Sequence, residues 1–383
     1  MNILFFEDVI TFGGARKSTV EFAKNLIDLG HKAAIMDMHG VCVPFLKSCQ
    51  ENSIPIYVVD KEHKQKLITN THNLLKKILN YIWFFFYSIR VNKRILELIY
   101  DITPDYIIVN NSQMLSYFLR KKPCCKIALF ARGWFIPQQI SFFDRLLYTH
   151  YVDKYLCVSE ATRHAVYCSR LSGLKEIMVV HNYIDEKKYE IIPKANIDNT
   201  NNCPIILVSG GFLPTKGLHV AVDIAKVLQE KHVDFKMVIT GIIYAAKQSQ
   251  QYYNKIVEKI AALNLEQNVT LVVNQTDVIS YFKSADIFIH PSSTEGLPRV
   301  VMEAMIMRIP VIANAVGGVT DYIINGYTGF IPRYNNVTDY VEYIELIMNN
   351  TELYREITEN AYRLVSKCYT KKNQIDSFIK SLQ

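Results

Sequence analysis

The chain alternates short apolar runs with segments of helical periodicity, and this alternation occurs twice. In the first half the expected strands are residues 3–6, 33–37, 54–58, 106–109, 126–130, 154–158 and 177–181. In the second half they are residues 205–209, 236–240, 269–273, 286–290, 310–313 and 328–331. Strands that alternate with helices favour a parallel sheet covered by helices on both faces. We therefore predict an α/β fold with two doubly wound, Rossmann-like domains in tandem.

A polar, Asn-rich stretch at residues 194–204 separates the two halves and is interpreted as a linker. It would join an N-terminal domain, 1–193, to a C-terminal domain, 205–383, which suits a chain too long for one ordinary core. After Asp339 the pattern is helical, and it leaves open whether the last helix returns to the first domain. Ligands of such sheets bind beyond the carboxyl ends of the strands, so two facing sheets would form a cleft.

The most informative local pattern is an expected strand, a Ser/Gly loop and a helix that begins around Pro298. Glu295 lies in the loop, and Glu303 lies eight residues later on the helix. A helix N-terminus offers unpaired N–H groups and partial positive charge, which suits a phosphate. Carboxylates beside it can accept hydrogen bonds from sugar hydroxyls. This combination predicts a pocket for a nucleotide sugar.

The spacing alone does not carry that prediction. Glu258 and Glu266 are also eight residues apart, but they lie in an ordinary amphipathic segment where solvated charges are expected. The loop and the proline distinguish the pair Glu295 and Glu303.

Paired glycines follow the first expected strand of each half. Gly13 and Gly14 precede the first helix and could let a ligand approach the backbone closely, although a plain tight turn explains them too. The following Lys17-Ser18 is not part of a P-loop, because Arg16 stands where that motif needs glycine. In the second half Gly210 and Gly211 precede Lys216-Gly217, and Lys216 could neutralise a departing diphosphate.

Together these pieces resemble the retaining glycosyltransferases of family 4, which have the two-domain GT-B fold. The resemblance covers nearly the whole chain in order. It rests on the Gly13-Gly14 loop, Leu29-Gly-His31, Val158-Ser159, His-Asn-x-x-Asp at 181–185, Lys216-Gly217, Glu295-Gly-Leu-Pro with Glu303, and Gly317-Gly318.

The resemblance implies that Lys216 holds the donor diphosphate, Glu295 contacts the transferred sugar and Glu303 binds the ribose hydroxyls. It implies acceptor binding by the N-terminal domain and donor binding by the C-terminal domain. It also implies that no metal or other cofactor is needed beyond the nucleotide-sugar co-substrate, and no Asp-x-Asp motif is present to hold a metal. The full expected set is Lys216, Glu295 and Arg132 for catalysis and Gly13, Gly14, Gly296, Leu297, Arg299 and Glu303 for donor binding.

The chain departs from the family pattern at three positions. Gly211 replaces an arginine that usually stands five residues before the lysine, so one diphosphate cation is missing or is supplied elsewhere, for instance by Arg299. Arg132 stands at the position of a histidine after the fifth N-terminal strand, and Asp321 replaces a usual glutamate. These departures put rate and mechanism in question more than fold.

The net charge of +7 is concentrated in the first half of the chain. Residues 1–182 carry 23 Lys/Arg and 15 Asp/Glu, whereas residues 183–383 carry 20 and 21. Residues 61–94 hold eight of these basic residues and one acid, around an aromatic run that is too short to span a bilayer. The segment suits either an interfacial helix on anionic lipid or a core helix with snorkelling lysines. No nucleic-acid motif is present.

These observations predict a sugar transferase of the cytoplasm, peripheral at the inner face of the membrane, with a glycan or lipid-linked acceptor. The eight cysteines lack a C-x-x-C pair and fit reduced thiols. Surface polysaccharide synthesis is the expected role. A nucleotide-sugar epimerase of the same architecture and a non-catalytic partner that binds donor remain as alternatives.

Overall fold

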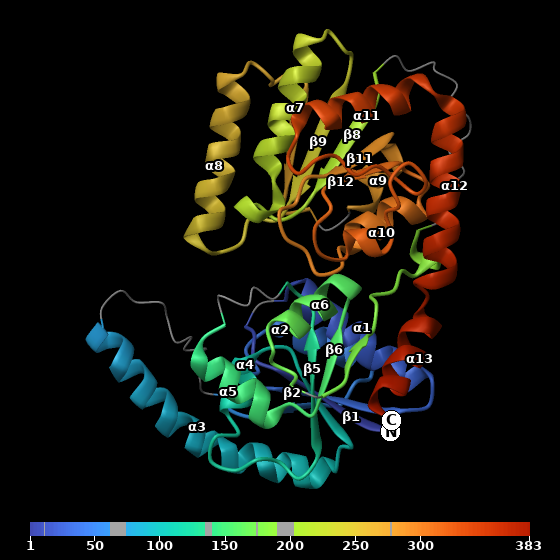
Figure 1. Cartoon of the computed structure of the whole chain (residues 1–383). Coiled ribbons are helices and arrows are strands. Elements are labelled where there is room, and N and C mark those ends of the chain that lie inside the picture. The colour runs from blue at the N-terminus through green and yellow to red at the C-terminus, as the bar shows by residue number, and fades with distance from the viewer. Residues whose placement is uncertain (11, 62–73, 135–139, 174, 190–202, 276–277) are drawn as a thin grey trace. The chain divides into compact units, whose positions relative to one another are not determined.

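The computed structural model describes residues 1–10, 12–61, 74–134, 140–173, 175–189, 203–275 and 278–383, except for the side chains of Ala15, Leu74, Lys76 and Lys77. Most of the expected linker, 194–204, therefore lies outside the described residues. The chain forms two compact units (Figure 1). Unit 1 comprises Met1–Val158, Thr162–Val180 and Ile375–Gln383, and unit 2 comprises Ser159–Ala161 and His181–Gln374.

A seven-stranded parallel sheet in the order β3-β2-β1-β4-β5-β6-β7 forms the centre of unit 1. Its strands are β1 (Asn2–Glu7), β2 (Lys32–Asp37), β3 (Ile56–Val58), β4 (Tyr106–Val109), β5 (Lys126–Ala131), β6 (Lys154–Cys157) and β7 (Ile177–Val179). The described helices between them are α1 (Gly14–Asp28), α2 (Val43–Glu51), α3 (Leu74–Ile102), α4 (Ser112–Ser116), α5 (Phe142–Tyr151) and α6 (Glu160–Cys168). The central strands are apolar on both faces because helices cover both sides.

A five-stranded parallel sheet in the order β10-β9-β8-β11-β12 forms the centre of unit 2. Its strands are β8 (Ile205–Ser209), β9 (Lys236–Gly241), β10 (Val269–Val273), β11 (Ile287–His290) and β12 (Val311–Ala313). The described helices of unit 2 are α7 (Leu218–Glu230), α8 (Lys247–Ala262), α9 (Ile279–Ser284), α10 (Arg299–Ile306), α11 (Val337–Asn349) and α12 (Thr351–Cys368). They are followed by α13 (Lys371–Leu382), most of which belongs to unit 1. The predicted α/β class with two Rossmann-like domains is confirmed.

One expected strand is absent. Residues 328–331 do not form a ladder, and Phe330 pairs with Ile312 only through an isolated bridge. The apolar run there is buried by packing beside β12 and not by strand pairing. Sequence periodicity does not separate these two cases for so short a segment.

Apart from the short segment Ser159–Ala161, the chain passes from unit 1 to unit 2 after Val180 and returns after Gln374. His181 to Tyr189 belong to unit 2, although the sequence placed them in the first domain, because their contacts lie with residues of the second half. The chain returns at Ile375, and the greater part of α13 belongs to unit 1. There Phe378 is fully buried and packs edge-on against Phe22, with ring centroids 4.7 Å apart. Lys154 donates a hydrogen bond of 2.8 Å to the carbonyl of Ser381.

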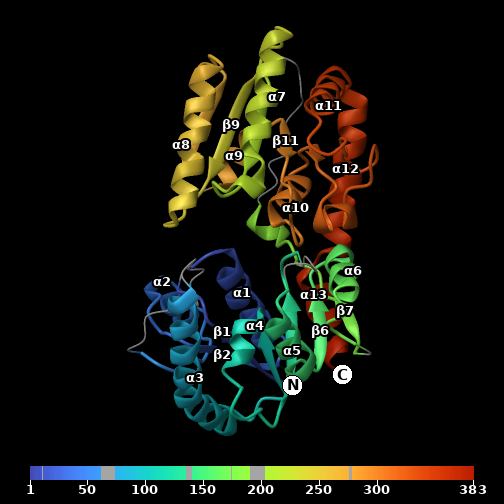
Figure 2. The same ribbon diagram turned by 60° about the vertical axis from the view of Figure 1, so that its left-hand side comes forward.

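Helix α3 has two parts with different surroundings. From Phe84 onward one face is buried in the core of unit 1, through residues such as Val91, Ile95 and Ile99. Before that point large apolar side chains are exposed, among them Leu79 and Trp83. Helices α3 and α13 lie at opposite flanks of unit 1 (Figure 2). No helix in the described part of the chain combines the length and apolarity needed to span a bilayer.

Candidate functional site

Three loops meet at the carboxyl edge of the sheet in unit 2. They follow β8, β11 and β12, which are neighbours in the sheet. The amide of Ser293 donates to the carbonyl of Thr215 at 2.8 Å, and the amide of Gly318 donates to the carbonyl of Gly296 at 2.7 Å. The loop after β11 is thus held between the other two, at the edge where doubly wound sheets bind ligands.

Two glycines make this close packing possible. Gly217 has φ +67°, and a Cβ atom there would lie 2.0 Å from the carbonyl oxygen of Pro291. Gly317 has φ +53°, and its Cβ atom would lie 1.9 Å from the carbonyl oxygen of Glu295. Any other residue would combine a left-handed backbone with a backbone collision. The two glycines therefore fix the path of the loop that carries Glu295.

The three loops and strand ends bring Lys216, Glu295 and His290 together. Oε1 of Glu295 accepts a hydrogen bond from Nζ of Lys216 at 2.7 Å and lies 3.0 Å from Nε2 of His290. Glu295 is buried, whereas Lys216 is partly exposed. Both contacts use the same oxygen, and among the described residues none donates to Oε2. One carboxylate oxygen and part of the lysine ammonium are therefore available to a ligand.

The electrostatic environment keeps Glu295 ionised. Burial by itself raises the pKa of this carboxyl, but hydrogen bonds and positive charge from His290 and Lys216 outweigh burial and hold the pKa at about 2. At neutral pH the pair is therefore a carboxylate and an ammonium. Such a pair can present acceptor and donor groups to a polar, anionic molecule at the same time.

Gly211 lies in the loop between β8 and Lys216, and an aromatic ring fills the space next to it. A Cβ atom at residue 211 would lie 2.5 Å from Cε2 and 2.7 Å from the hydroxyl oxygen of Tyr244. The amide of Tyr244 donates to Oγ of Ser249, which in turn donates to the carbonyl of Phe212. The loop that carries the ring is thus tied to the loop that carries Gly211, and the place of the missing arginine is occupied.

Helix α10 places the remaining donor-binding candidates of unit 2. Pro298 is its N-cap and Arg299 is the first helical residue, so the helix begins one residue later than expected. Gly296 and Leu297 precede it, and their carbonyls accept hydrogen bonds from Gly318 and Asn182. Glu303 lies on the first turns of the helix, where Oε1 accepts a hydrogen bond of 2.9 Å from Tyr189.

The motif at residues 181–185 contacts this region instead of closing a strand of unit 1. The side-chain amide of Asn182 donates to the carbonyl of Leu297 at 3.0 Å. Nε2 of His181 lies 3.1 Å from Oδ2 of Asp321, which follows Gly317-Gly318. Aspartate has a shorter side chain than the glutamate usual at this position, but the carboxylate of Asp321 still contacts His181 of this motif.

Gly13, Gly14 and Arg132 belong to unit 1. Gly13 is the extended N-cap of α1 and Gly14 its first residue, and a Cβ atom at either position would meet nothing within 4 Å. Arg132 follows β5 and donates to Oγ1 of Thr19 at 3.1 Å. Arg16 is buried and pairs with Asp37 at 2.6 Å.

Sequence reasoning missed His290, Tyr244 and Tyr189. The signal for His290 was present, because it is the last residue of a strand that leads into the site loop. The contacts of Tyr244 and Tyr189 depend on chain segments that are distant in sequence, and no local pattern indicates them.

Comparisons with known proteins concern mainly this half of the chain. Residues 189–364, which include Lys216, Glu295 and Glu303, match the family described as glycosyl transferases group 1. An uncharacterized glycosyltransferase of Haemophilus influenzae is 31% identical over 180 residues, which are 47% of this chain and 48% of that protein. The capsular polysaccharide biosynthesis glycosyltransferase CapM of Staphylococcus aureus is 25% identical over 232 residues, 56% of this chain and 57% of that one. The chain thus matches about half the length of these curated relatives.

Solved structures extend the similarity of fold to the whole chain. HepE from Anabaena, in complex with UDP, superposes with a TM-score of 0.78 at 19% identity, over 100% of this chain and 99% of that one. A glycosyltransferase from Rickettsia africae superposes with a TM-score of 0.76 at 20% identity, over 100% and 97%. The fold of this chain is the GT-B fold.

Proposed function

We propose that this protein is a retaining glycosyltransferase that moves a sugar from a nucleoside-diphosphate sugar to a hydroxyl of a glycan or lipid-linked acceptor. The observation that carries the proposal is the cluster of Lys216, Glu295 and His290 at the carboxyl edge of a parallel sheet. It lies within the segment that matches the group 1 glycosyl transferases. The UDP in the HepE complex supports a nucleotide donor, and the name of CapM supports a role in surface polysaccharide synthesis.

In the proposed reaction Lys216 stabilises the negative charge that grows on the departing diphosphate. The bond between the anomeric carbon and the diphosphate breaks, and a bond to the acceptor oxygen forms on the same face of the sugar. The proton of the acceptor hydroxyl passes to the leaving diphosphate, so we assign no protein nucleophile. Oε2 of Glu295 accepts a hydrogen bond from a hydroxyl of the transferred sugar, and the carboxylate of Glu303 accepts hydrogen bonds from the ribose hydroxyls.

Roles are proposed for the other predicted residues as well. Arg299 and the N-terminus of α10 add positive charge for the diphosphate, beside the backbone of Gly296 and Leu297. In unit 1, Gly13 and Gly14 contribute to donor binding and Arg132 contributes to catalysis. We propose that no metal is required, since these groups carry the charge. Full activity in excess chelator is the expected result, and its loss would contradict this part.

The central test is a thermal-shift screen of nucleotide sugars, followed by a transfer assay with the donor that stabilises the protein most. Lys216→Ala should lower kcat about 10²–10³-fold. Lys226→Ala is the matched control, because Lys226 is a partly exposed lysine of the same unit that pairs within α7. Normal turnover of the Lys216 variant would remove this residue from the reaction.

The same assay distinguishes the alternatives. A donor that is inverted or hydrolysed without any acceptor would indicate an epimerase. A donor that binds and never reacts would indicate a non-catalytic partner. The names of the matched relatives favour neither.

We further propose that the protein works in the cytoplasm, bound peripherally to the anionic inner face of the membrane. Each basic residue near an anionic surface contributes about 1 kcal/mol, which salt screens. Replacing Lys76, Lys77, Lys93 and Arg94 by Gln should release the protein from anionic vesicles at low salt without weakening donor binding. Native protein that stays in the supernatant in vesicle sedimentation would contradict the proposal.

A further inference from the structure

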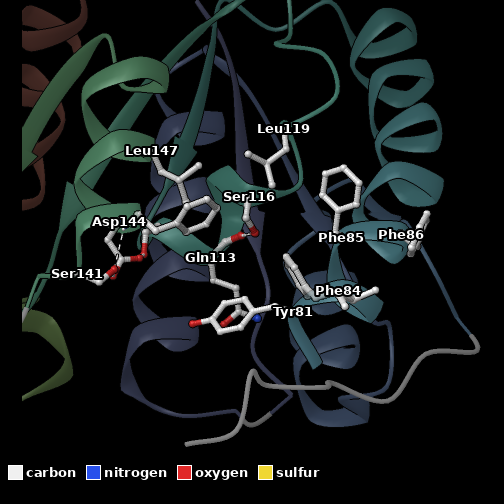
Figure 3. A pocket seen from close by; sticks show the side chains of 13 residues that line it. Tyr81, Phe84, Phe85, Phe86, Gln113, Ser116, Leu119, Ser141, Asp144 and Leu147 are labelled. Carbon is white, nitrogen blue, oxygen red and sulfur yellow. Dashed lines mark hydrogen bonds between the residues drawn. The ribbon is translucent and has the colours of Figure 1, made fainter. Parts of the chain in front are cut away.

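Unit 1 contains a pocket of about 740 Å³ that none of the predicted site residues lines. Its walls come from α3, α4 and the start of α5 (Figure 3). Ligand pockets in proteins typically have volumes of roughly 300–1,000 Å³. The pocket therefore has the size of a binding site, and its lining indicates what it could bind.

Most of the lining is aromatic or aliphatic. Tyr81, Phe84 and Phe85 of α3 lie on one side, and Leu147 of α5 lies on the other, with Leu119 beside them (Figure 3). Phe143 of α5 also contributes. Such walls favour a ligand that buries apolar surface, because burying apolar surface is the main gain they offer.

The polar groups of the lining bond largely to one another. The carboxylate of Asp144 accepts hydrogen bonds of 2.6 Å from the hydroxyls of Ser112 and Ser141. The hydroxyl of Ser116 donates to the carbonyl of Gln113. These groups need no ligand to satisfy them, and no lysine or arginine lines the pocket among the described residues. The pocket is thus unsuited to an anionic or strongly polar ligand.

The surroundings of the pocket favour a lipid over a soluble apolar molecule. The same helix continues from the pocket into an exposed apolar stretch, with Leu75 and Leu79 largely exposed. Beyond the pocket α3 carries the exposed cations Arg90, Lys93 and Arg94, which pair with two carboxylates, Asp60 and Glu97, and so leave an excess of positive charge. Exposed apolar and basic side chains on one helix are the pattern of a segment that contacts anionic lipid. A chain leaving a bilayer at this helix would meet the pocket.

We propose that the pocket holds the hydrocarbon chain of a lipid-linked acceptor. The inference rests on the proposed glycosyl transfer, and it selects the lipid-linked acceptor from the two acceptor classes. Part of the acceptor's binding energy would then come from its chain, far along the molecule from the hydroxyl that receives the sugar.

The first test measures binding of alkyl glucosides with chains of six to ten carbons, each below its micelle concentration. Each CH₂ group that enters the pocket should tighten binding about fourfold in calorimetry. Phe85→Ser and Phe143→Ser together should flatten this dependence on chain length. Both side chains are about half exposed, so the variant should fold, and its thermal unfolding checks this.

Matched control substitutions are available on the same two helices. Phe142 and Tyr100 are almost fully exposed and do not line the pocket. Phe142→Ser with Tyr100→Ser should keep the full dependence on chain length. Affinity that does not change with chain length, or an equal loss in lining and control variants, would overturn the proposal. The proposal would also be overturned if the native protein formed a concentration-dependent dimer that the lining variant does not form. A second copy of the protein would then be the molecule that covers the pocket.

A second test compares the same acceptor sugar on a long alkyl chain and on a methyl group in the transfer assay. The lining variant should raise KM for the long-chain acceptor at least tenfold and leave KM for the methyl acceptor unchanged. Transfer with no preference for the chain would overturn the pocket proposal and leave the transferase proposal standing. Binding of the alkyl chain without any sugar transfer would support the pocket proposal and overturn the transferase proposal.

Discussion

The tyrosine beside Gly211 allows a direct test of how the diphosphate is held. The resemblance to family 4 implies an arginine at residue 211, but a Cβ atom there would lie 2.5 Å from the ring of Tyr244. Gly211→Arg should therefore displace the ring. Overpacking costs about 1–3 kcal/mol, and the lower end applies because the ring is 43% exposed and can turn.

A guanidinium at residue 211 would in turn gain a charged hydrogen bond to the diphosphate, worth about 1.5–3 kcal/mol. In the single variant the cost of moving the ring, about 1 kcal/mol, is subtracted from this gain, so nucleoside diphosphate affinity should rise only about 2- to 30-fold. In the double variant with Tyr244→Ala the obstruction is gone. Affinity should then rise about 10- to 100-fold, while Tyr244→Ala alone should give no gain.

Titration calorimetry with the nucleoside diphosphate of the preferred donor measures the four affinities. Gln251→Arg, on the exposed face of α8, controls for added positive charge on unit 2. An equal gain in the single and double variants would refute the view that Tyr244 occupies this space. The absence of a gain in both would refute the placement of the diphosphate beside residue 211.

Three further predictions concern stability and binding. The pKa of Glu295 is about 2 in the folded protein and 4.5 in an unfolded chain, so its ionisation should add about 3 kcal/mol to the unfolding free energy above pH 4.5, and this contribution should be lost as pH falls toward 2. In denaturant unfolding, the unfolding free energy of Glu295→Gln should therefore depend less on pH than that of the native protein. An unchanged pH profile would exclude Glu295 as the source of the dependence. Glu303→Ala should weaken nucleoside diphosphate binding about ten- to a hundredfold in calorimetry, whereas Glu258→Ala should have no effect. Phe378→Ala should lower the unfolding free energy of unit 1 by about 3–5 kcal/mol, and a loss below 1 kcal/mol would show that α13 does not hold that core together.

The fold could be predicted from sequence because its determinants are local. Runs such as Ile205–Val208 are apolar throughout, as is typical of strands buried on both faces, and they recur between helical segments. Glu295 could be found because a loop and a proline surround it. The aromatic run of α3 was ambiguous, because a helix that is apolar all round does not indicate which face the core covers.

The remaining features depend on contacts between distant segments. The contact between Lys216 and Glu295 joins residues 79 apart in sequence, in loops that Gly217 and Gly317 allow to pack together. Each glycine looks like an ordinary turn residue in isolation. Tyr244 is 33 residues from Gly211, and no periodicity links them. The assignment of residues 181–189 to unit 2 likewise follows from tertiary contacts and not from any change in composition.

The return of α13 to unit 1 has a consequence for synthesis on the ribosome. Domains generally fold in order as the chain emerges, but unit 1 lacks Phe378 until residues 375–383 have been made. At roughly 5–20 residues per second, the nearly 200 residues of unit 2 that come between take about 10–40 seconds to synthesise. During that interval Phe22 and its neighbours would present an uncovered apolar surface. We therefore expect nascent unit 1 to be a chaperone client and unit 2 to complete its core first.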